Sequence, residues 1–209
     1  MRAPGTRVRA GNAMARTRSS VLRAAVTVVA ERGTRRVSMA DVAAAAGIAK
    51  GTLYNHFRTK DDVWAALVHA EVEALVDECR GLPLVVALGH AAQRIGAHPA
   101  VRRIAADEPA VLAALVTPTP DDTAWTTARE AVGEALAAAG KDPAAKGLVL
   151  RWLASHLTAP DPTAASTAEL LAAALPLATS GPETAAGSPA RPASPVPATG
   201  LARVATSAP

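Results

Sequence analysis

The sequence predicts an all-α protein, and three observations lead to this fold class. Half of the 209 residues are hydrophobic, and alanine, the strongest helix former, dominates that half. Aromatic residues make up only 2% of the chain, and β-branched residues never alternate with polar ones over a long run. Glycine and proline also divide the chain into segments whose apolar residues recur at helical spacing.

The first helix is expected from Thr17 to Arg32, and Gly33 is placed to end it in a left-handed conformation. Residues 1–16 contain mainly Arg, Ala, Gly and Pro with few apolar side chains, so we expect a disordered basic arm there. Met14 is an alternative start of the chain. The apolar stripe of the helix comprises Val21, Leu22, Ala25, Val28 and Val29.

Two short helices are expected next, joined by a tight turn. Ser38 begins the first of them, because its hydroxyl can accept the Asp41 amide while the Asp41 carboxylate accepts the Ser38 amide, a capping box. Gly47 ends that helix and permits a sharp turn into the next, which is expected over residues 49–57.

A longer helix is predicted from Thr59 to Arg80, since Thr59 and Asp62 form a second capping box. It connects the first three helices to a series of further helices separated by Gly and Pro. The predicted organisation is a basic arm (1–16), a three-helix domain (17–60), a helical domain (61–178) and a disordered Pro/Ala-rich tail (179–209). The later helices are expected at 84–97, 100–106, 109–116, 121–139, 144–157 and 163–178.

Positive charge is concentrated in the N-terminal part of the chain. Residues 1–60 contain twelve Lys and Arg but two acidic residues, a net charge of +10. The remaining residues contain ten basic and sixteen acidic side chains, a net charge of −6. A basic end on an acidic body is typical of a module that binds nucleic-acid phosphates.

The expected third helix has one apolar and one polar side. Leu53 and Phe57 are four residues apart and should face the core, and Gly51 would let the backbone approach another molecule closely. Two short helices joined by a tight turn form a helix-turn-helix, which places its second helix in the DNA major groove. The polar side chains expected on the other sides are Lys50, Thr52, Tyr54, Asn55 and His56.

The run AGIAKGTLYNHFRTKD, residues 46–61, resembles the signature of the tetracycline-repressor (TetR) family, and the match covers about residues 17–64. The resemblance implies an N-terminal three-helix helix-turn-helix DNA-binding domain followed by a C-terminal helical ligand-binding and dimerisation domain. Ala49 departs from the family, which usually has a Ser or Thr cap there, and the absence of a cap costs about 1 kcal/mol. Ala40 leaves the preceding helix without a base-reading side chain.

The resemblance also assigns roles to these residues. Lys50 and Asn55 are the expected base readers, because Lys matches the acceptors of guanine and Asn matches adenine, while Gly51 allows the approach. The basic arm is expected either to enter the adjacent minor groove or to remain solvated. The expected phosphate contacts are Ser38, Thr52, Tyr54, His56 and Lys60.

The resemblance further implies a homodimer formed by the last two helices, with a small-molecule effector bound in the middle of the helical domain. Two reading helices would then meet half-sites roughly 34 Å apart in a palindromic operator. The alternative for these two helices is an ordinary intrachain core. Their apolar stripes comprise Leu148, Val149, Trp152, Leu153 and His156, and Leu170, Leu171, Ala174 and Leu175. The expected effector contacts are His90, Arg94, Trp125 and Trp152, and the expected effector is apolar.

Other classes of protein find no support in the sequence. The single cysteine, Cys79, excludes an internal disulfide, and the histidines show no metal-ligand spacing, so no metal or cofactor is expected. There is no catalytic triad, phosphate loop or pair of catalytic carboxylates, so an enzyme is not expected. No apolar run reaches the roughly 20 residues of a membrane span, and the basic N-terminus lacks the apolar stretch of a signal peptide, which predicts a cytoplasmic protein.

The sequence therefore predicts a DNA-binding transcriptional regulator, and a repressor released from its operator by an effector is the preferred form. One alternative is an activator or a ligand-independent regulator with the same fold. A second alternative is a helical ligand-binding protein that does not bind DNA.

Overall fold

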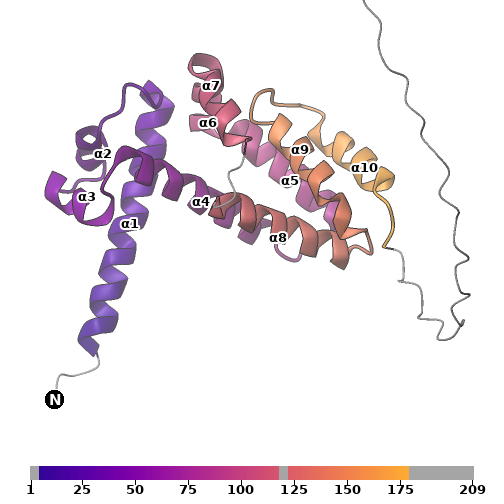
Figure 1. Cartoon of the computed structure of the whole chain (residues 1–209), viewed down its shortest axis with the longest axis horizontal. Coiled ribbons are helices and arrows are strands. Elements are labelled where there is room, and N and C mark those ends of the chain that lie inside the picture. Colours follow the sequence, from indigo (N-terminus) through magenta and orange to yellow (C-terminus); the bar gives the residue numbers. More distant parts are fainter. Residues whose placement is uncertain (1–4, 118–121, 179–209) are drawn as a thin grey trace, which may run out of the picture. The chain divides into compact units, whose positions relative to one another are not determined.

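The computed structural model describes residues 5–117 and 122–178. These ranges are helical, apart from connecting loops and one isolated β-bridge between Lys141 and Leu177, which confirms the all-α prediction (Figure 1). The helices are α1 (Gly5–Arg32), α2 (Met39–Ala45), α3 (Lys50–His56), α4 (Lys60–Cys79), α5 (Leu84–Ala97), α6 (Pro99–Asp107), α7 (Pro109–Leu115), α8 (Thr123–Ala138), the 3-10 helix η1 (Pro143–Ala145), α9 (Lys146–Ser155) and α10 (Ala164–Ala174).

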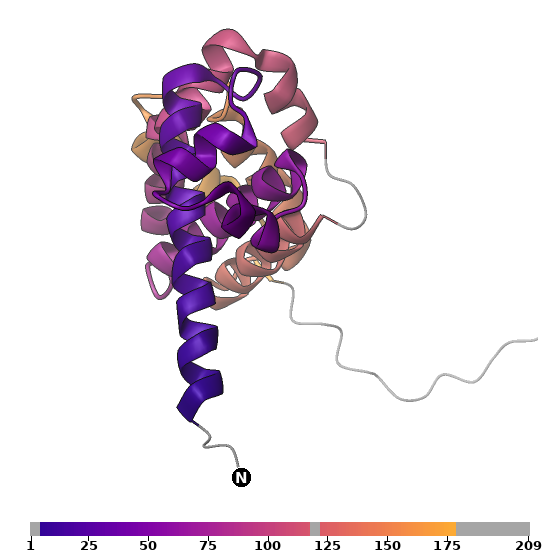
Figure 2. The same ribbon diagram turned by 90° about the vertical axis from the view of Figure 1, so that its left-hand side faces the viewer.

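The first three helices and the start of α4, which face the viewer in Figure 2, pack around one apolar core. Val21 of α1, Val42 of α2, Leu53 of α3 and Val63 of α4 are fully buried in this core. Burying such a side chain contributes roughly 1.5–3 kcal/mol. Because seven-residue helices such as α2 and α3 are unstable alone, this shared core is what holds them in place.

Side-chain caps define where α2 and α4 begin, and both predicted capping boxes are confirmed. The Ser38 hydroxyl accepts the Asp41 amide at 3.2 Å, and the Asp41 carboxylate accepts the Ser38 amide at 2.8 Å. At α4 the equivalent distances between Thr59 and Asp62 are 3.1 and 2.9 Å. Hydrogen bonds from Ser38 and from Thr59 lower the pKa of the Asp41 and Asp62 carboxyls, respectively. Gly47 turns the chain between α2 and α3 at a φ of 67°.

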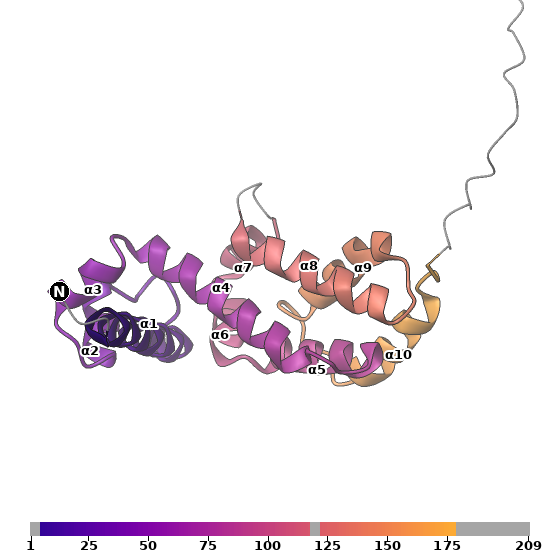
Figure 3. The same ribbon diagram turned by 90° about the horizontal axis from the view of Figure 1, so that it is seen from below.

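Two further apolar clusters organise the helical domain. One contains Leu88 of α5, Leu136 of α8, Val149 of α9 and Ala168 of α10. The other joins α1 to α6 and α7 and is built from Val29, Ala100, Ile104 and Leu112. Helix α4 leads from the three-helix unit into this domain and runs beside α8 (Figure 3). The second of these clusters therefore ties the N-terminal helix directly to the helical domain.

Helix α1 begins at Gly5, earlier than the predicted start at Thr17. Residues 5–16 contain no proline and several good helix formers, so the sequence allows the helix to begin before Thr17. This part of α1 projects beyond α2 and α3 (Figures 1 and 2). The prediction of disorder over residues 1–16 is therefore replaced by a helix from Gly5. Residues 1–4 of the predicted arm and all of the predicted tail at 179–209 lie outside the described residues.

Helix α10 ends at Ala174, although a helix was predicted to continue to residue 178. Pro176 disfavours the helical conformation of the residue before it, and Leu175 is accordingly extended at a ψ of 135°. The chain then runs along the loop after α8, where the Asp142 amide donates to the Pro176 carbonyl at 2.9 Å. The other helices after α1 agree with the predicted ranges to within about two residues at each end.

Candidate nucleic-acid interface

Helix α3 presents a polar surface whose orientation is fixed by two buried anchors. Leu53 and Phe57 are 0% and 3% exposed and lie in the core of the three-helix unit, as predicted. The side chains between them consequently cannot rotate into the core. The residues that face outward are Lys50, Gly51, Thr52, Tyr54 and Asn55, and His56 is half-buried at the end of the helix.

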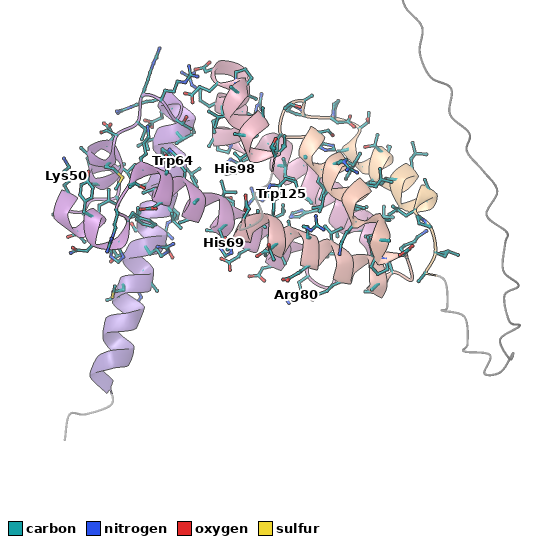
Figure 4. The ribbon with its side chains drawn as sticks, viewed as in Figure 1. Lys50, Trp64, His69, Arg80, His98 and Trp125 are labelled. Atoms are coloured by element: carbon teal, nitrogen blue, oxygen red, sulfur yellow. The ribbon has the colours of Figure 1, made fainter. Side chains whose placement is uncertain are left out.

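The N-terminal half of this surface is positively charged. The Lys50 ammonium lies 5.8 Å from the centre of the Tyr54 ring, a cation–π contact across one helical turn, and Figure 4 shows Lys50 at the outer edge of the three-helix unit. Tyr54 is 42% exposed, so its hydroxyl can reach an external acceptor. Ala49 makes no side-chain cap at the start of α3, as predicted, which leaves the first backbone amides to solvent or to an incoming oxygen atom.

A basic hollow of about 370 Å³ opens beside α3. The Arg18 guanidinium, from α1, is stacked over the Phe57 ring at 4.5 Å, which holds a fixed positive charge next to the recognition surface. His56, Arg58 and His69 also line the hollow, with Asp62 as its acidic member. Residues of α1, α3, α4 and the loop between α3 and α4, together with Thr123 of α8, thus line one hollow.

The two remaining predicted contacts lie at the starts of α2 and α4. Ser38 is exposed at the N-cap of α2. The Lys60 ammonium, however, donates to the carbonyls of Thr34 and Val37 at 3.2 and 3.3 Å, so it holds the loop between α1 and α2. This role of Lys60 depends on the tertiary fold and could not be inferred from the sequence.

The four predicted effector contacts lie in three different environments. His90 and Arg94 of α5 face α4, where the Glu78 carboxylate lies 2.7 Å from His90 Nε2 and 3.0 Å from Arg94 Nε. The Trp125 indole N–H donates to the Leu115 carbonyl at 2.8 Å, between α7 and α8. Trp152 of α9 packs against the apolar cluster around Leu88. The four residues therefore make separate contacts within the chain, and the structure does not bring them together in one site.

The ionic contacts between α4 and α5 form a network that sequence analysis missed. Besides Glu78, α4 contributes Glu71, which lies 3.4 Å from His98 Nε2 and 3.9 Å from Arg94. The hydrogen bond from His98 lowers the pKa of Glu71 despite its partial burial, and hydrogen bonds from Arg94 and His90 lower the pKa of Glu78. The one sign of this network in the sequence is that Glu71 interrupts the apolar pattern of α4.

The predicted apolar stripes of the last two helices are divided between the core and the surface. Val149, His156 and Leu175 are buried within the chain. Leu148 and Leu170 are 51% and 71% exposed. Helical periodicity places these apolar residues together on each helix. It cannot distinguish residues that pack inside the chain from residues that are exposed on its surface.

Residues 5–117 and 122–178 contain no helix that is both long enough and apolar enough to cross a lipid bilayer. In the same ranges, no three His, Cys, Asp or Glu side chains come together as a metal-ion site.

A capped helix-turn-helix with an outward-facing polar helix beside basic side chains is the arrangement typical of helix-turn-helix DNA-binding domains. The family model described as "Bacterial regulatory proteins, tetR family" matches residues 21–67. The HTH-type transcriptional repressor KstR2 of Rhodococcus jostii (strain RHA1) is 36% identical over 63 residues, which are 30% of this chain and 31% of that protein. The chain thus matches about a third of the length of this curated relative.

Solved structures extend the similarity over most of the chain. The TetR family repressor AlkX from Dietzia sp. strain DQ12-45-1b has a TM-score of 0.56 at 22% identity, covering 75% of this chain and 93% of AlkX. A TetR-family transcriptional regulator from Pectobacterium atrosepticum has a TM-score of 0.55 at 22% identity, covering 77% and 90% of the two chains. Residues 21–67 therefore match the TetR family in sequence, and the described fold is similar to that of solved TetR-family regulators.

Proposed function

We propose that the chain is a homodimeric transcriptional repressor that occupies a palindromic operator through α3 and leaves it when a small molecule binds the helical domain. The observation that carries this proposal is the polar surface of α3, held outward by the buried Leu53 and Phe57. A lone reading helix binds DNA too weakly for regulation, whereas a two-fold dimer presents two of them to one operator. Binding to chromosomal DNA would place this activity in the cytoplasm.

Base recognition is assigned to the N-terminal and central part of α3. Lys50 can donate to guanine N7 and O6, and Asn55 can form two hydrogen bonds with adenine. Gly51, which follows Lys50 at the start of α3, has open space where a side chain would stand, so the backbone can approach the duplex. The proposed phosphate contacts are Ser38, Thr52, Tyr54, His56 and Lys60.

The experiment that tests this proposal is selection of bound sequences from a random duplex pool, followed by affinity measurements at several salt concentrations. Lys50→Ala should cost about 1–3 kcal/mol of binding free energy and relax the preference at one base position. Lys60→Ala should weaken binding to all sequences alike. The matched control is Arg80→Ala, which also removes one positive charge but at an exposed position at the end of α4. Equal losses for Lys50→Ala and Arg80→Ala would contradict base reading by α3.

The dimer is proposed to form through α9 and α10. Leu148 and Leu170 are exposed there, and exposed Ala173 and Ala174 would allow close helix approach. Leu170→Glu should convert the dimer to a monomer in light-scattering measurements and abolish binding to a palindromic duplex. An unchanged mass would exclude this surface as the interface.

The effector is proposed to be apolar, because the buried residues of the cluster between α5, α8, α9 and α10 are all Ala, Leu and Val. A mainly apolar hollow of about 380 Å³ lies between the start of α5, the end of α8 and α10. A ligand-independent regulator or an activator remains the second candidate. The two are distinguished by adding candidate apolar molecules to the protein–duplex complex: a repressor of the proposed kind releases the duplex, and the alternative retains it.

A further inference from the structure

Glu108 is a buried carboxylate among the described residues, and neither DNA contact nor apolar packing explains why an acidic side chain is buried there. Glu108, at the junction of α6 and α7, is only 6% exposed. Transferring a carboxylate from water to a protein interior is unfavourable unless hydrogen bonds replace its lost hydration. A Glu buried at such a place therefore needs hydrogen-bond donors that replace its hydration.

Those hydrogen bonds go to the DNA-binding domain. The Thr34 hydroxyl donates to Glu108 Oε2, and the Arg35 amide donates to Glu108 Oε1 at 3.2 Å. Glu108 is also the N-cap residue of α7, but its side chain makes no cap hydrogen bond there. The carboxylate is thus directed away from its own helix and towards the loop between α1 and α2.

Burial raises the pKa of Glu108, but the hydrogen bonds from Thr34 and Arg35 outweigh burial and bring the pKa below the usual value for Glu. The carboxylate is consequently ionised at neutral pH. A charged acceptor makes stronger hydrogen bonds than a neutral one.

The same loop is held from its other side. The Lys60 ammonium at the start of α4 donates to the carbonyls of Thr34 and Val37. Glu108 therefore binds donors of the loop and Lys60 binds its acceptors. Gly33 begins the loop at a φ of 76°, and a β-carbon there would collide with Glu108 Oε1, so the contact requires glycine at this position.

This loop ends at Ser38, the residue that begins α2. A shift of the loop would move the N-cap and with it the whole α2–α3 pair, because the two helices share one packed core. Val29 of α1 packs with Ile104 of α6 and Leu112 of α7 in one buried apolar cluster, which holds the two helices on either side of Glu108 against α1.

We propose that Glu108 is a positioning residue for DNA binding: from the α6–α7 junction it fixes the α1–α2 loop and so sets the orientation of the reading helix. A displacement of that junction would pass to the helix-turn-helix through this contact. The proposal relies on the proposed function only for its DNA-binding readout, since the fixing of the loop can be measured without DNA.

The test uses the full chain and compares Glu108→Ala, Glu108→Gln and Thr34→Val with the control Asp107→Asn. Asp107 is the neighbouring acid, but it pairs with Arg103 on its own helix, 2.9 Å away. Glu108→Ala should weaken binding to the selected duplex about tenfold without changing the slope of log K against log salt, because the substitution leaves every phosphate contact in place. Amide exchange at Arg35 and at the start of α2 should accelerate at least tenfold.

Glu108→Gln should restore affinity to within about threefold, since its amide can accept from the Arg35 N–H and donate to the Thr34 oxygen. Thr34→Val removes a single hydrogen bond and serves where Glu108→Ala folds poorly; it should give an intermediate loss of affinity. Asp107→Asn should match the wild type. Unchanged affinity and unchanged exchange in folded Glu108→Ala would overturn the proposal, and so would faster exchange with unchanged affinity.

A wild-type chain that binds no duplex would instead refute the proposed function. The exchange rates of the four variants would then still decide whether Glu108 fixes the loop.

Discussion

Replacing Ala49 with serine tests whether the reading helix is weakened by its missing cap. Ala49 has the extended conformation of an N-cap residue, with φ −65° and ψ 144°, but no side-chain hydrogen bond. A serine hydroxyl in this conformation can accept an amide of the first turn, as Ser38 does for α2. An added cap stabilises a helix by about 1 kcal/mol.

This magnitude has a direct consequence for local opening of α3. A gain of about 1 kcal/mol corresponds to a roughly fivefold lower open fraction, so the amides of α3 should exchange about five times more slowly in Ala49→Ser. The assay is native-state hydrogen exchange of the free protein. Ala44→Ser is the control, because it introduces the same side chain at an exposed position inside α2, where no cap can form. Equal exchange rates of α3 in Ala49→Ser and the wild type would refute the reasoning.

Three further predictions concern the core, the acid response and the N-terminal helix. Leu53→Ala should lower the free energy of unfolding by about 2–5 kcal/mol in urea titrations, since Leu53 is fully buried between α1, α2 and α4; a loss below about 1 kcal/mol would contradict the packing. Glu71 has a pKa below its usual 4.5, so its stabilising contribution is present above that pH and is lost as the pH falls below it. Glu71→Gln should therefore lose less stability than the wild type between about pH 5 and 3. An equal loss in the two proteins would show that protonation of Glu71 does not cause the acid destabilisation. Removal of residues 1–13 should reduce the salt slope of DNA binding by about 0.9 for each phosphate that the segment neutralises, and an unchanged affinity and slope would show that it neutralises none.

Local signals in the sequence were sufficient for the recognition helix. Capping boxes depend on residues three apart, and a positive φ at Gly47 depends on a single residue, so both can be recognised without tertiary information. The burial of Leu53 and Phe57 follows from their spacing of four residues. Together these local features are enough to place the outward-facing side chains of α3.

Features that depend on distant contacts could not be predicted in this way. The sequence shows Asp107 and Glu108 as an ordinary acidic pair between two helices, although one pairs with Arg103 and the other is buried against Thr34 and Arg35. Lys60 is proposed to contact phosphate, and its place in the sequence does not reveal that its ammonium also donates to the α1–α2 loop. For Glu108 and Lys60 the partner lies far away in the sequence, and no periodicity connects the two.

The central claim is that side chains on the outer face of α3 discriminate between base pairs, and one measurement tests it most directly. The affinities of the wild type and Asn55→Ala are compared on the selected duplex and on duplexes altered one base pair at a time. The account predicts that the wild type loses roughly 1–3 kcal/mol at a defined A·T pair, and that Asn55→Ala no longer distinguishes this pair while its salt dependence stays the same. If Asn55→Ala kept the full sequence preference of the wild type at every position, the assignment of base reading to this residue of α3 would be contradicted.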